Sequence, residues 1–173
     1  PDYKKYDVGV FSVFQYEINS KFKAEVGARY DLNIYDVYKY YDQSDWTKRF
    51  ESQFKRFEIS TSGSRILTRP QFRFHNFSAN IGLAYTPNES GYLKLNFSRS
   101  SRTPNAAELF ADGLHHSAAV IERGDLNIQQ EIVYQINLNS KLKLDVLQGW
   151  VLETQPYIMM SDNFINQIFL VIS

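Results

Sequence analysis

The alternation of apolar and polar residues over long stretches constrains the fold of this chain more than any other sequence feature. Between Phe22 and Ile34, every even-numbered residue is apolar or aromatic and every odd-numbered residue is charged, polar or Gly. An extended strand separates two such classes onto opposite faces, whereas a helix would mix them on each face. The sequence therefore predicts a long β-strand with one apolar face and one charged face.

The same period of two recurs along the chain, with turn-forming residues between the repeats. Further strands are predicted around Tyr6–Glu17, Phe77–Tyr85, Leu93–Ser98, Ile132–Asn139 and, more weakly, Trp150–Met159, where Pro156 indicates a bulge or an edge. Short turns are predicted at 19–20, 86–91 and 140–149, and long polar links at 36–73 and 102–127. This succession predicts an all-β, antiparallel, up-and-down sheet of about six strands whose long loops gather at one end.

The alternation alone fits a soluble β-sandwich, which buries its apolar face, and a membrane β-barrel, whose apolar face meets lipid. The Phe22–Ile34 segment is longer than most strands of soluble proteins, which favours the membrane barrel. Aromatic residues near the predicted turns, such as Tyr16, Phe22 and Tyr85, suit a girdle at a membrane boundary. No apolar run is long enough for a transmembrane helix.

Charge and composition exclude several other classes of function. Lys and Arg number 19 and Asp and Glu number 19, so the chain as a whole offers no basic field for nucleic acid. The absence of Cys excludes disulfide frameworks and thiolate sites. No Ser-His-Asp pattern, phosphate-binding loop or spaced metal quartet occurs. We therefore expect no enzymatic activity, no cofactor and no nucleic-acid partner.

One segment in the second half carries the most specific motif. Arg102-Thr103-Pro104-Asn105-Ala106-Ala107-Glu108-Leu109 is followed by Asp112-Gly113, then by Glu122-Arg123-Gly124-Asp125-Leu126 and Gln130-Glu131. This series closely resembles the conserved barrel segment of TonB-dependent outer-membrane receptors, in which an Arg-x-Pro-x-x-x-Glu-Leu loop follows a strand and a Glu opens the next. The segments 27–31 and 152–165 extend the resemblance over most of the chain.

The resemblance implies a transmembrane barrel of about 22 strands in the bacterial outer membrane, closed around an N-terminal plug domain. It also implies energised import through the TonB complex, which pulls on the plug. About six strands cannot close that barrel. We therefore expect residues 1–173 to be an arc of the barrel without its plug, which aggregates or needs detergent when expressed alone. The expected cargo is a metal ion or an iron complex, whether siderophore-bound iron, haem or zinc.

Two rival interpretations remain beside the receptor. The first is a soluble β-barrel or sandwich that binds a small ligand, and polar positions inside several strands disfavour the dry core that it needs. The second is a passive porin, which needs neither plug nor TonB, and the motif from Arg102 to Glu131 weighs against it.

His115 and His116 in the second long link are candidate metal ligands. Together with Glu108, Asp112 or Glu122 they offer imidazole and carboxylate groups, which suit Zn²⁺ and similar ions. Some family members that take up zinc or haem have a His in the matching loop. The alternative is a polar loop with exposed histidines, since adjacent strand residues point to opposite faces and only a turn brings both to one ion.

The first long link holds an aromatic and basic cluster. Tyr38, Tyr40 and Trp46 lie among Lys and Arg residues, and aromatic rings with nearby cations suit an organic chelate. The same residues also suit the upper end of a strand with its aromatic girdle.

The remaining motif residues suit a structural role in the second link. We expect Arg102 and Asn105, with Glu108, to satisfy the backbone of an ordered loop, with Pro104 fixing its entry and Gly113 its bend. The alternative is that Arg102, Asn105 and Glu108 shape the passage of the substrate.

Overall fold

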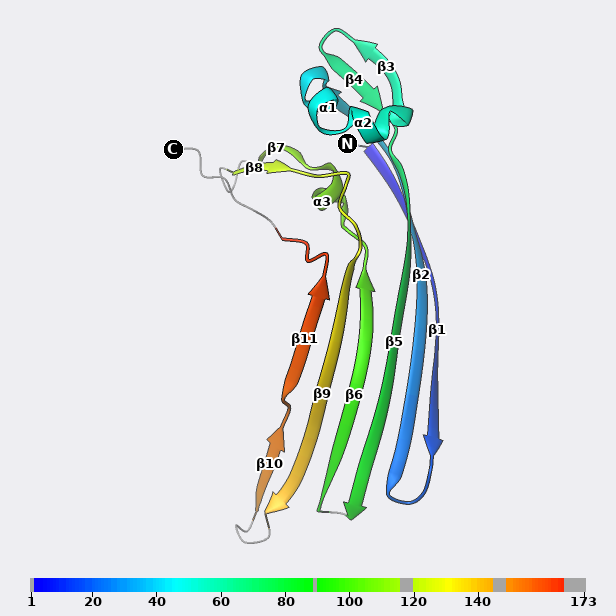
Figure 1. Ribbon diagram of the computed structural model, residues 1–173, viewed down its shortest axis with the longest axis vertical. Helices are drawn as coiled ribbons and strands as arrows, with labels where there is room; N and C mark the ends of the chain where they lie inside the picture. Colours follow the sequence, from blue (N-terminus) through cyan, green and yellow to red (C-terminus); the bar gives the residue numbers. More distant parts are fainter. Residues whose placement is uncertain (1, 89, 116–119, 145–148, 167–173) are drawn as a thin grey trace.

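The computed structural model is one curved antiparallel sheet with its loops gathered at one end (Figure 1). It describes residues 2–88, 90–115, 120–144 and 149–166. The long strands are β1 (Asp2–Glu17), β2 (Phe22–Asp42), β5 (Gln71–Asn88), β6 (Gly91–Arg102) and β9 (Glu131–Leu144). They pair in the order β1-β2-β5-β6-β9, and every pairing is antiparallel, which confirms the predicted sheet.

A broken strand completes the sheet beside β9. β10 (Trp150–Thr154) and β11 (Tyr157–Asp162) both pair with β9 and are separated by Gln155 and Pro156. Pro has no N–H to give to a ladder, although its carbonyl still accepts the Leu138 N–H at 3.0 Å. The irregularity expected at Pro156 is thus present. Within the described residues the sheet is open, with β1 at one edge and β10 and β11 at the other.

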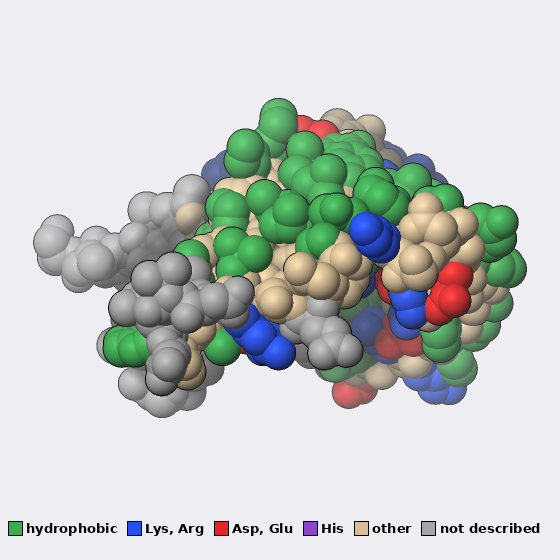
Figure 2. Space-filling model, turned by 90° about the horizontal axis from the view of Figure 1, so that it is seen from below, with side chains coloured by type: hydrophobic (Ala, Val, Ile, Leu, Met, Phe, Trp, Pro, Cys, Tyr) green, Lys and Arg blue, Asp and Glu red, His purple; other side chains and the backbone are tan. Residues whose placement is uncertain are grey.

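The strand register defines two faces of the sheet. Odd-numbered residues of β1, β2 and β9 share one face with even-numbered residues of β5 and β6, and we call this the inner face because the loops fold over it. The opposite, outer face is mostly apolar and exposed: Phe14 is 71% exposed, Ile81 55% and Phe97 44%. Figure 2 shows hydrophobic side chains gathered over one side of the sheet. An exposed apolar surface of this extent is typical of a lipid-facing wall.

The turns opposite the loops are short. In the β1–β2 turn, Asn19 Oδ1 accepts the N–H groups of Lys21 and Phe22 at 2.9 and 3.0 Å. At the β5–β6 turn, a Cβ on Gly91 would lie 2.2 Å from the Lys141 carbonyl oxygen, so only Gly allows this approach to β9. The predicted 140–149 turn was too long, because β9 continues to Leu144 and there pairs with β10.

The two long connections contain structure of their own. The first, at 43–70, holds α1 (Gln43–Arg49), α2 (Glu51–Phe54), the 3₁₀ turn η1 (Lys55–Phe57), β3 (Glu58–Ser62) and β4 (Arg65–Thr68). The second holds α3 (Ala106–Phe110), β7 (Asp112–His115) and β8 (Val120–Arg123). β4 pairs with the upper end of β2, which explains why β2 extends to Asp42, well into the predicted 36–73 link. No helix in the described part of the chain is long and apolar enough to cross a membrane.

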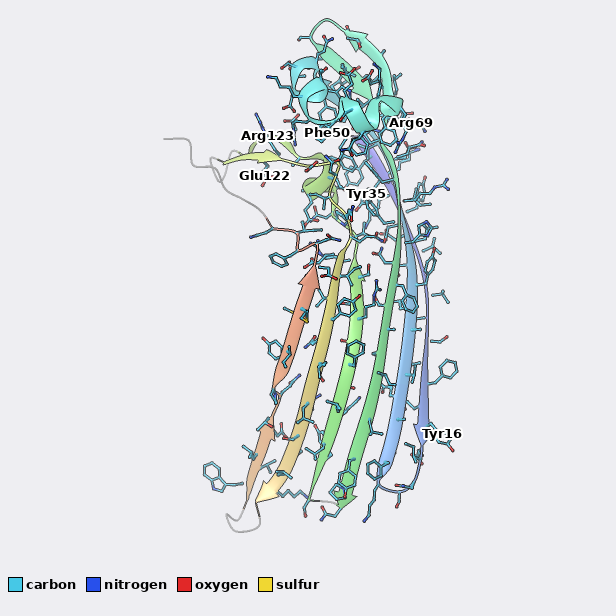
Figure 3. The ribbon with its side chains drawn as sticks, in the orientation of Figure 1. Tyr16, Tyr35, Phe50, Arg69, Glu122 and Arg123 are labelled. Atoms are coloured by element: carbon cyan, nitrogen blue, oxygen red, sulfur yellow. The ribbon has the colours of Figure 1, made fainter. Side chains whose placement is uncertain are left out.

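Both connections contribute to one hydrophobic core, which we call the loop core. Its buried residues are Tyr35, Val37, Tyr41, Trp46, Phe50, Phe54, Ile66, Phe74, Leu109, Phe110 and Leu126. Residues from β2 and β5 form its base, and residues from the two connections pack on them. Figure 3 shows Tyr35 and Phe50 together at this end of the sheet.

Candidate functional site

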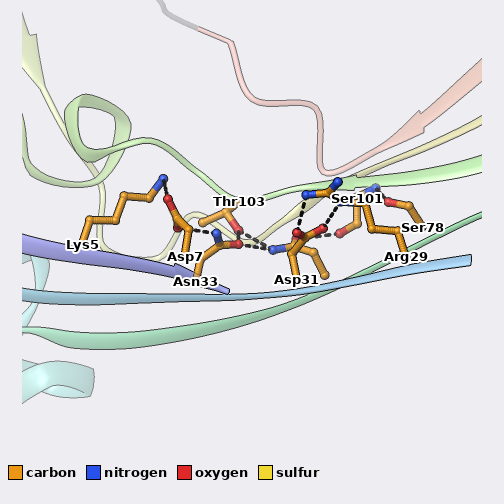
Figure 4. Close-up of polar contacts among 9 residues, drawn as sticks. Lys5, Asp7, Arg29, Asp31, Asn33, Ser78, Ser101 and Thr103 are labelled. Atoms are coloured by element: carbon orange, nitrogen blue, oxygen red, sulfur yellow. Dashed lines mark hydrogen bonds and ion pairs between the residues drawn. The ribbon is translucent and has the colours of Figure 1, made fainter. Parts of the chain in front are cut away.

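A connected polar network lies on the inner face directly below the loop core (Figure 4). The buried Asn76 is its centre: its Nδ2 donates to Asn33 Oδ1 at 2.6 Å, and its Oδ1 accepts the Ser101 hydroxyl at 2.8 Å. Asn76 also donates to Thr103, whose hydroxyl donates to Asn33 at 2.7 Å. The network thus joins β2 and β5 to the start of the second connection, and buried networks that satisfy every member fix geometry strongly.

Charged pairs continue the polar inner face away from this network. Lys5 and Asp7 on β1 lie 2.9 Å apart, and Arg29 donates to both carboxylate oxygens of Asp31 at 2.7 and 2.6 Å. Exposed pairs of this kind contribute little to stability. They do keep the inner face hydrophilic, which suits contact with water or with a polar cargo.

The first part of the motif forms an ordered loop entry. Arg102 Nε donates to Glu131 at 3.0 Å, and its terminal nitrogen reaches both oxygens of Glu108 at 3.0 and 3.1 Å. Glu108 and Asn105 form a capping box at the start of α3, in which each side chain accepts the other's backbone N–H. The carbonyl of the buried Pro104 accepts the Tyr35 hydroxyl at 3.1 Å. Glu108 is therefore engaged in loop structure.

A buried Lys ties the second connection to the upper end of β2. Lys39 is 7% exposed, and its Nζ donates to the Phe110 carbonyl at 2.7 Å and lies 3.5 Å from Asp112 Oδ2. Burial lowers the pKa of Lys39, and burial also raises the pKa of Tyr41, whose ring lies 4.3 Å from Nζ. The Tyr41 hydroxyl has no hydrogen-bond partner among the described residues. From α1, Arg49 donates to the Gly124 carbonyl at 2.6 Å, so the two connections are held together.

The candidate metal ligands lie on or near the β7–β8 hairpin. Asp112 pairs with Arg123, and Gly113 pairs with Glu122, which Figure 3 labels on this hairpin. Gly113 has φ 152°, a value that favours Gly. The backbone of His115 belongs to β7, whereas His116 lies outside the described residues. In the described part of the chain, no three His, Asp or Glu residues form a metal-binding group. A ligand role for His115 and His116 stays a prediction.

The aromatic candidates of the first connection occupy different surfaces. Trp46 is fully buried in the loop core, and its Nε1 donates to Glu58 at 2.7 Å, so its ring has no surface to offer a ligand. Tyr38 and Tyr40 are 43% and 57% exposed, on the outer face of β2. These three residues therefore do not form one binding surface.

The inner-face network around Asn33 and Asn76 and the burial of Lys39 were not predicted from the sequence. Both depend on the strand register, which assigns each residue to a face of the sheet. Lys39 shares the inner face with Val37 and Tyr41, so its position between two apolar residues was the available signal.

The comparisons with known proteins agree with the geometry. Residues 1–169 match the family model described as TonB dependent receptor-like, beta-barrel. No curated protein and no solved structure gives a significant match. The family indicates a place in the Gram-negative outer membrane and an interaction with TonB. The family model covers nearly all of the chain. In the structure, the sheet is antiparallel with an apolar outer face, and the Arg102–Glu131 motif forms an ordered loop at one end of the sheet. The chain therefore belongs to the family of TonB-dependent receptor β-barrels, as its motif predicted.

Proposed function

We propose that the receptor of which this chain is a part imports a metal ion or a metal chelate, namely zinc, haem or siderophore-bound iron, with energy supplied through TonB. The cargo binds first at the loop end and then passes along the polar inner face, and no covalent step is involved. The observation that carries this proposal is the β7–β8 hairpin at the loop end, whose register places the backbone positions of Glu122 and His115 on one face and Asp112 on the other.

The hairpin supports the proposal through the chemistry of its side chains. Asp112 and Glu122 lie on paired strands, and the backbone of His115 is in register with Val120 on the same hairpin. Carboxylate and imidazole are ligands for Zn²⁺ and for iron ions. Asp112 also lies near the buried Lys39, so a cation that binds Asp112 competes with an existing charge interaction. Cargo binding would thereby loosen the contact between β2 and the second connection.

The inner face supports the second half of the proposal. Below the hairpin it presents the Asn33–Asn76 network and the charged pairs of β1 and β2. The exposed charged pairs exchange hydrogen bonds with water and with hydrophilic cargo at little cost, whereas the buried Asn33–Asn76 network keeps the geometry of the face fixed. A passage lined in this way suits a hydrated ion or a polar chelate.

The test is uptake by the full-length receptor in bacterial outer membranes. Zinc, haem and ferric chelates are supplied one at a time, with and without an energised TonB system. The test variant is His115→Ala/His116→Ala. The matched control is His75→Ala, because His75 lies on the outer face of β5 and its Nδ1 is 2.6 Å from the Tyr30 hydroxyl, away from the hairpin.

We expect TonB-dependent uptake of one metal species that fails in the double variant and persists in His75→Ala. Energy-dependent uptake of a metal species that the double variant retains would leave the import proposal standing and remove the histidines from the site. If no metal species enters in an energy-dependent manner, the cargo proposal is wrong.

A further inference from the structure

Two cations hold the second connection at its neck, the point where β7 begins and β8 ends. Lys39 donates to the Phe110 carbonyl at 2.7 Å, and Arg49 donates to the Gly124 carbonyl at 2.6 Å. The Gly124 N–H in turn donates to the Ala111 carbonyl at 2.6 Å, which closes the neck. Figure 1 shows β7 and β8 extending from this point past α3 and away from the sheet. The hairpin is therefore anchored at its base, and Lys39 is one of its two anchors.

The two anchoring cations differ in how firmly they are paired. Arg49 donates to Asp45 at 3.1 Å in addition to its carbonyl partner. Lys39 is 7% exposed, and its only ion-pair partner among the described residues is Asp112, with Nζ and Oδ2 3.5 Å apart. This separation exceeds the roughly 2.7–2.9 Å of a direct charge-assisted hydrogen bond. The Asp112 side chain is 38% exposed, so the carboxylate that neutralises Lys39 is held loosely and remains open to solvent.

A buried hydroxyl group lies beside this loose ion pair. The Tyr41 hydroxyl is inaccessible to solvent and forms no hydrogen bond with the described residues, and Lys39 Nζ lies over the Tyr41 ring, 4.3 Å from its centre. Burial raises the pKa of Tyr41 and the Asp112 carboxylate raises it further, so the hydroxyl stays neutral. Buried hydroxyls without a partner are rare, because nothing compensates their desolvation. Tyr41 thus offers an unused acceptor oxygen next to a buried cation.

The hydrogen-bonding capacity of Lys39 matches this acceptor. An ammonium group has three N–H donors, and the described residues supply Lys39 with two partners, the Phe110 carbonyl and Asp112. If Asp112 left, the buried ammonium would keep one backbone carbonyl, and a buried charge without its counter-charge is strongly destabilising. A small rotation of the Lys39 side chain from the ring of Tyr41 toward its hydroxyl oxygen restores a second partner.

We propose that the Tyr41 hydroxyl is a reserve acceptor for Lys39, which allows Asp112 to exchange between Lys39 and a cation at the hairpin. When Asp112 turns away, Nζ keeps its hydrogen bond to the Phe110 carbonyl and donates to the Tyr41 oxygen in place of the carboxylate. The contact between β2 and the second connection is then loosened but not lost. The exchange rests on the proposed function for its trigger, a metal ion at Asp112, whereas the role of Tyr41 can be tested without any metal.

A double-mutant cycle on the full-length receptor in detergent tests the role of Tyr41. Asp112→Ala and Tyr41→Phe are made singly and together, and amide exchange at 106–115 is followed by mass spectrometry. Heat-resistant electrophoretic mobility checks that each barrel is folded. The same cycle in a Lys39→Met protein shows whether the coupling passes through Lys39.

The matched control cycle uses Tyr38→Phe in place of Tyr41→Phe. Tyr38 is 43% exposed on the outer face of β2, and its ring lies near Arg69 instead of Lys39. It therefore removes a tyrosine hydroxyl from the same strand without touching the neck. If the Lys39→Met protein does not fold, the test cycle and this control cycle decide the proposal.

We expect Asp112→Ala to speed exchange at the neck by less than about threefold when Tyr41 is present and by about tenfold or more beside Tyr41→Phe. Tyr41→Phe alone should change exchange little, because its hydroxyl is unused while Asp112 holds Lys39. The effect of Asp112→Ala should be the same with and without Tyr38→Phe, and the coupling to Tyr41 should vanish in the Lys39→Met protein. Additive effects of Asp112→Ala and Tyr41→Phe would overturn the proposal, as would coupling that persists without Lys39.

Titration with Zn²⁺ links the exchange to the proposed function. Tyr41→Phe should bind Zn²⁺ about threefold to tenfold more weakly than the unmodified receptor, because Asp112 is then harder to release, and Tyr38→Phe should bind it equally well. Equal affinity of Tyr41→Phe and the unmodified receptor would overturn the exchange. If the unmodified receptor binds no Zn²⁺, the hairpin fails as a zinc site in the proposed function, whereas the cycle still decides the role of Tyr41.

Discussion

The wall and the loop end of this molecule are built from the same strands in opposite ways. In the wall, the inner face of β2 carries charged residues such as Lys23 and Arg29, and its apolar outer face is exposed. Beyond Asn33, the inner face carries Tyr35, Val37 and Tyr41, which are at most 3% exposed. The wall therefore needs lipid as its apolar partner, whereas the loop end supplies its own core. Stability at the loop end should accordingly depend on core packing within the chain.

The largest effect is expected from removing the central ring of the loop core. Trp46→Ala should destabilise the loop end by about 3–5 kcal/mol, because the ring is fully buried between Tyr41 and Phe50 and a cavity replaces it. Hydrogen exchange of the full-length receptor, followed by mass spectrometry, should show faster exchange at 43–70 and 103–128 and unchanged exchange in the wall.

The control for this prediction is a truncation on the lipid-facing wall. Val26→Ala removes an apolar side chain that is 47% exposed on the outer face, and it should cost less than about 1 kcal/mol. Equal destabilisation by the two substitutions would mean that the loop end and the wall do not differ in the origin of their stability.

On the polar inner face, hydrogen bonds beneath the loop core should stabilise the molecule more than those lower in the wall. Asn76→Ala should cost about 1–3 kcal/mol, because Asn76 is 3% exposed and its loss removes its hydrogen bonds with Asn33, Thr103 and Ser101. Chemical denaturation of the receptor in detergent, with hydrogen exchange at the start of the second connection, measures the effect.

An Asn–Asn pair lower in the wall provides the matched control. Asn96 donates to Asn137 at 3.0 Å, but both side chains are only partly buried, so water replaces the lost bond. Asn137→Ala should therefore cost less than Asn76→Ala. The reverse order would show that burial beneath the loop core does not strengthen the network.

A smaller effect is expected at the start of α3. Asn105→Ala removes one half of the capping box and should cost about 1 kcal/mol, seen as faster exchange at 105–112. Asn105→Ser keeps an acceptor for the Glu108 N–H and should restore most of the protection. If the Ser variant behaves like the Ala variant, capping is not the role of Asn105 in this loop.

The wall could be predicted from the sequence, because its two faces meet different solvents and the alternation records this directly. The upper end of β2 could not be predicted in this way. Between Tyr35 and Tyr41 apolar residues lie on both faces of the strand, so the alternation of apolar and polar residues is lost. Their burial depends on loops that lie far away in sequence, and β4 extends the strand only once the first connection has folded back. The structure of the upper end of β2 is therefore determined by tertiary packing, which the local sequence pattern does not contain.

The candidate site was predictable to a lesser degree. The motif identified Arg102 and Glu108 from residue spacing, and the structure adds Glu131 as the second partner of Arg102. Trp46 was placed among ligand candidates because it lies near cations in sequence, but its ring packs into the loop core. Composition in a loop thus indicates which groups are present, and only the packing decides which of them reach the surface.

The smallest effect is expected from pH at the start of α1. The Ser44 hydroxyl and the N–H groups of Ser44 and Asp45 all donate to Asp42 Oδ1, and they lower the pKa of that carboxyl below its ordinary value of 3.8. A lowered folded-state pKa means that the stabilisation is complete above the ordinary pKa and is lost as pH falls through the folded value. Exchange protection of α1, corrected for intrinsic rates, should therefore decline at low pH. Asp42→Asn keeps a capping oxygen that cannot titrate, so its α1 should show no such decline. A parallel decline in both proteins would mean that the charge of Asp42 does not stabilise the loop end.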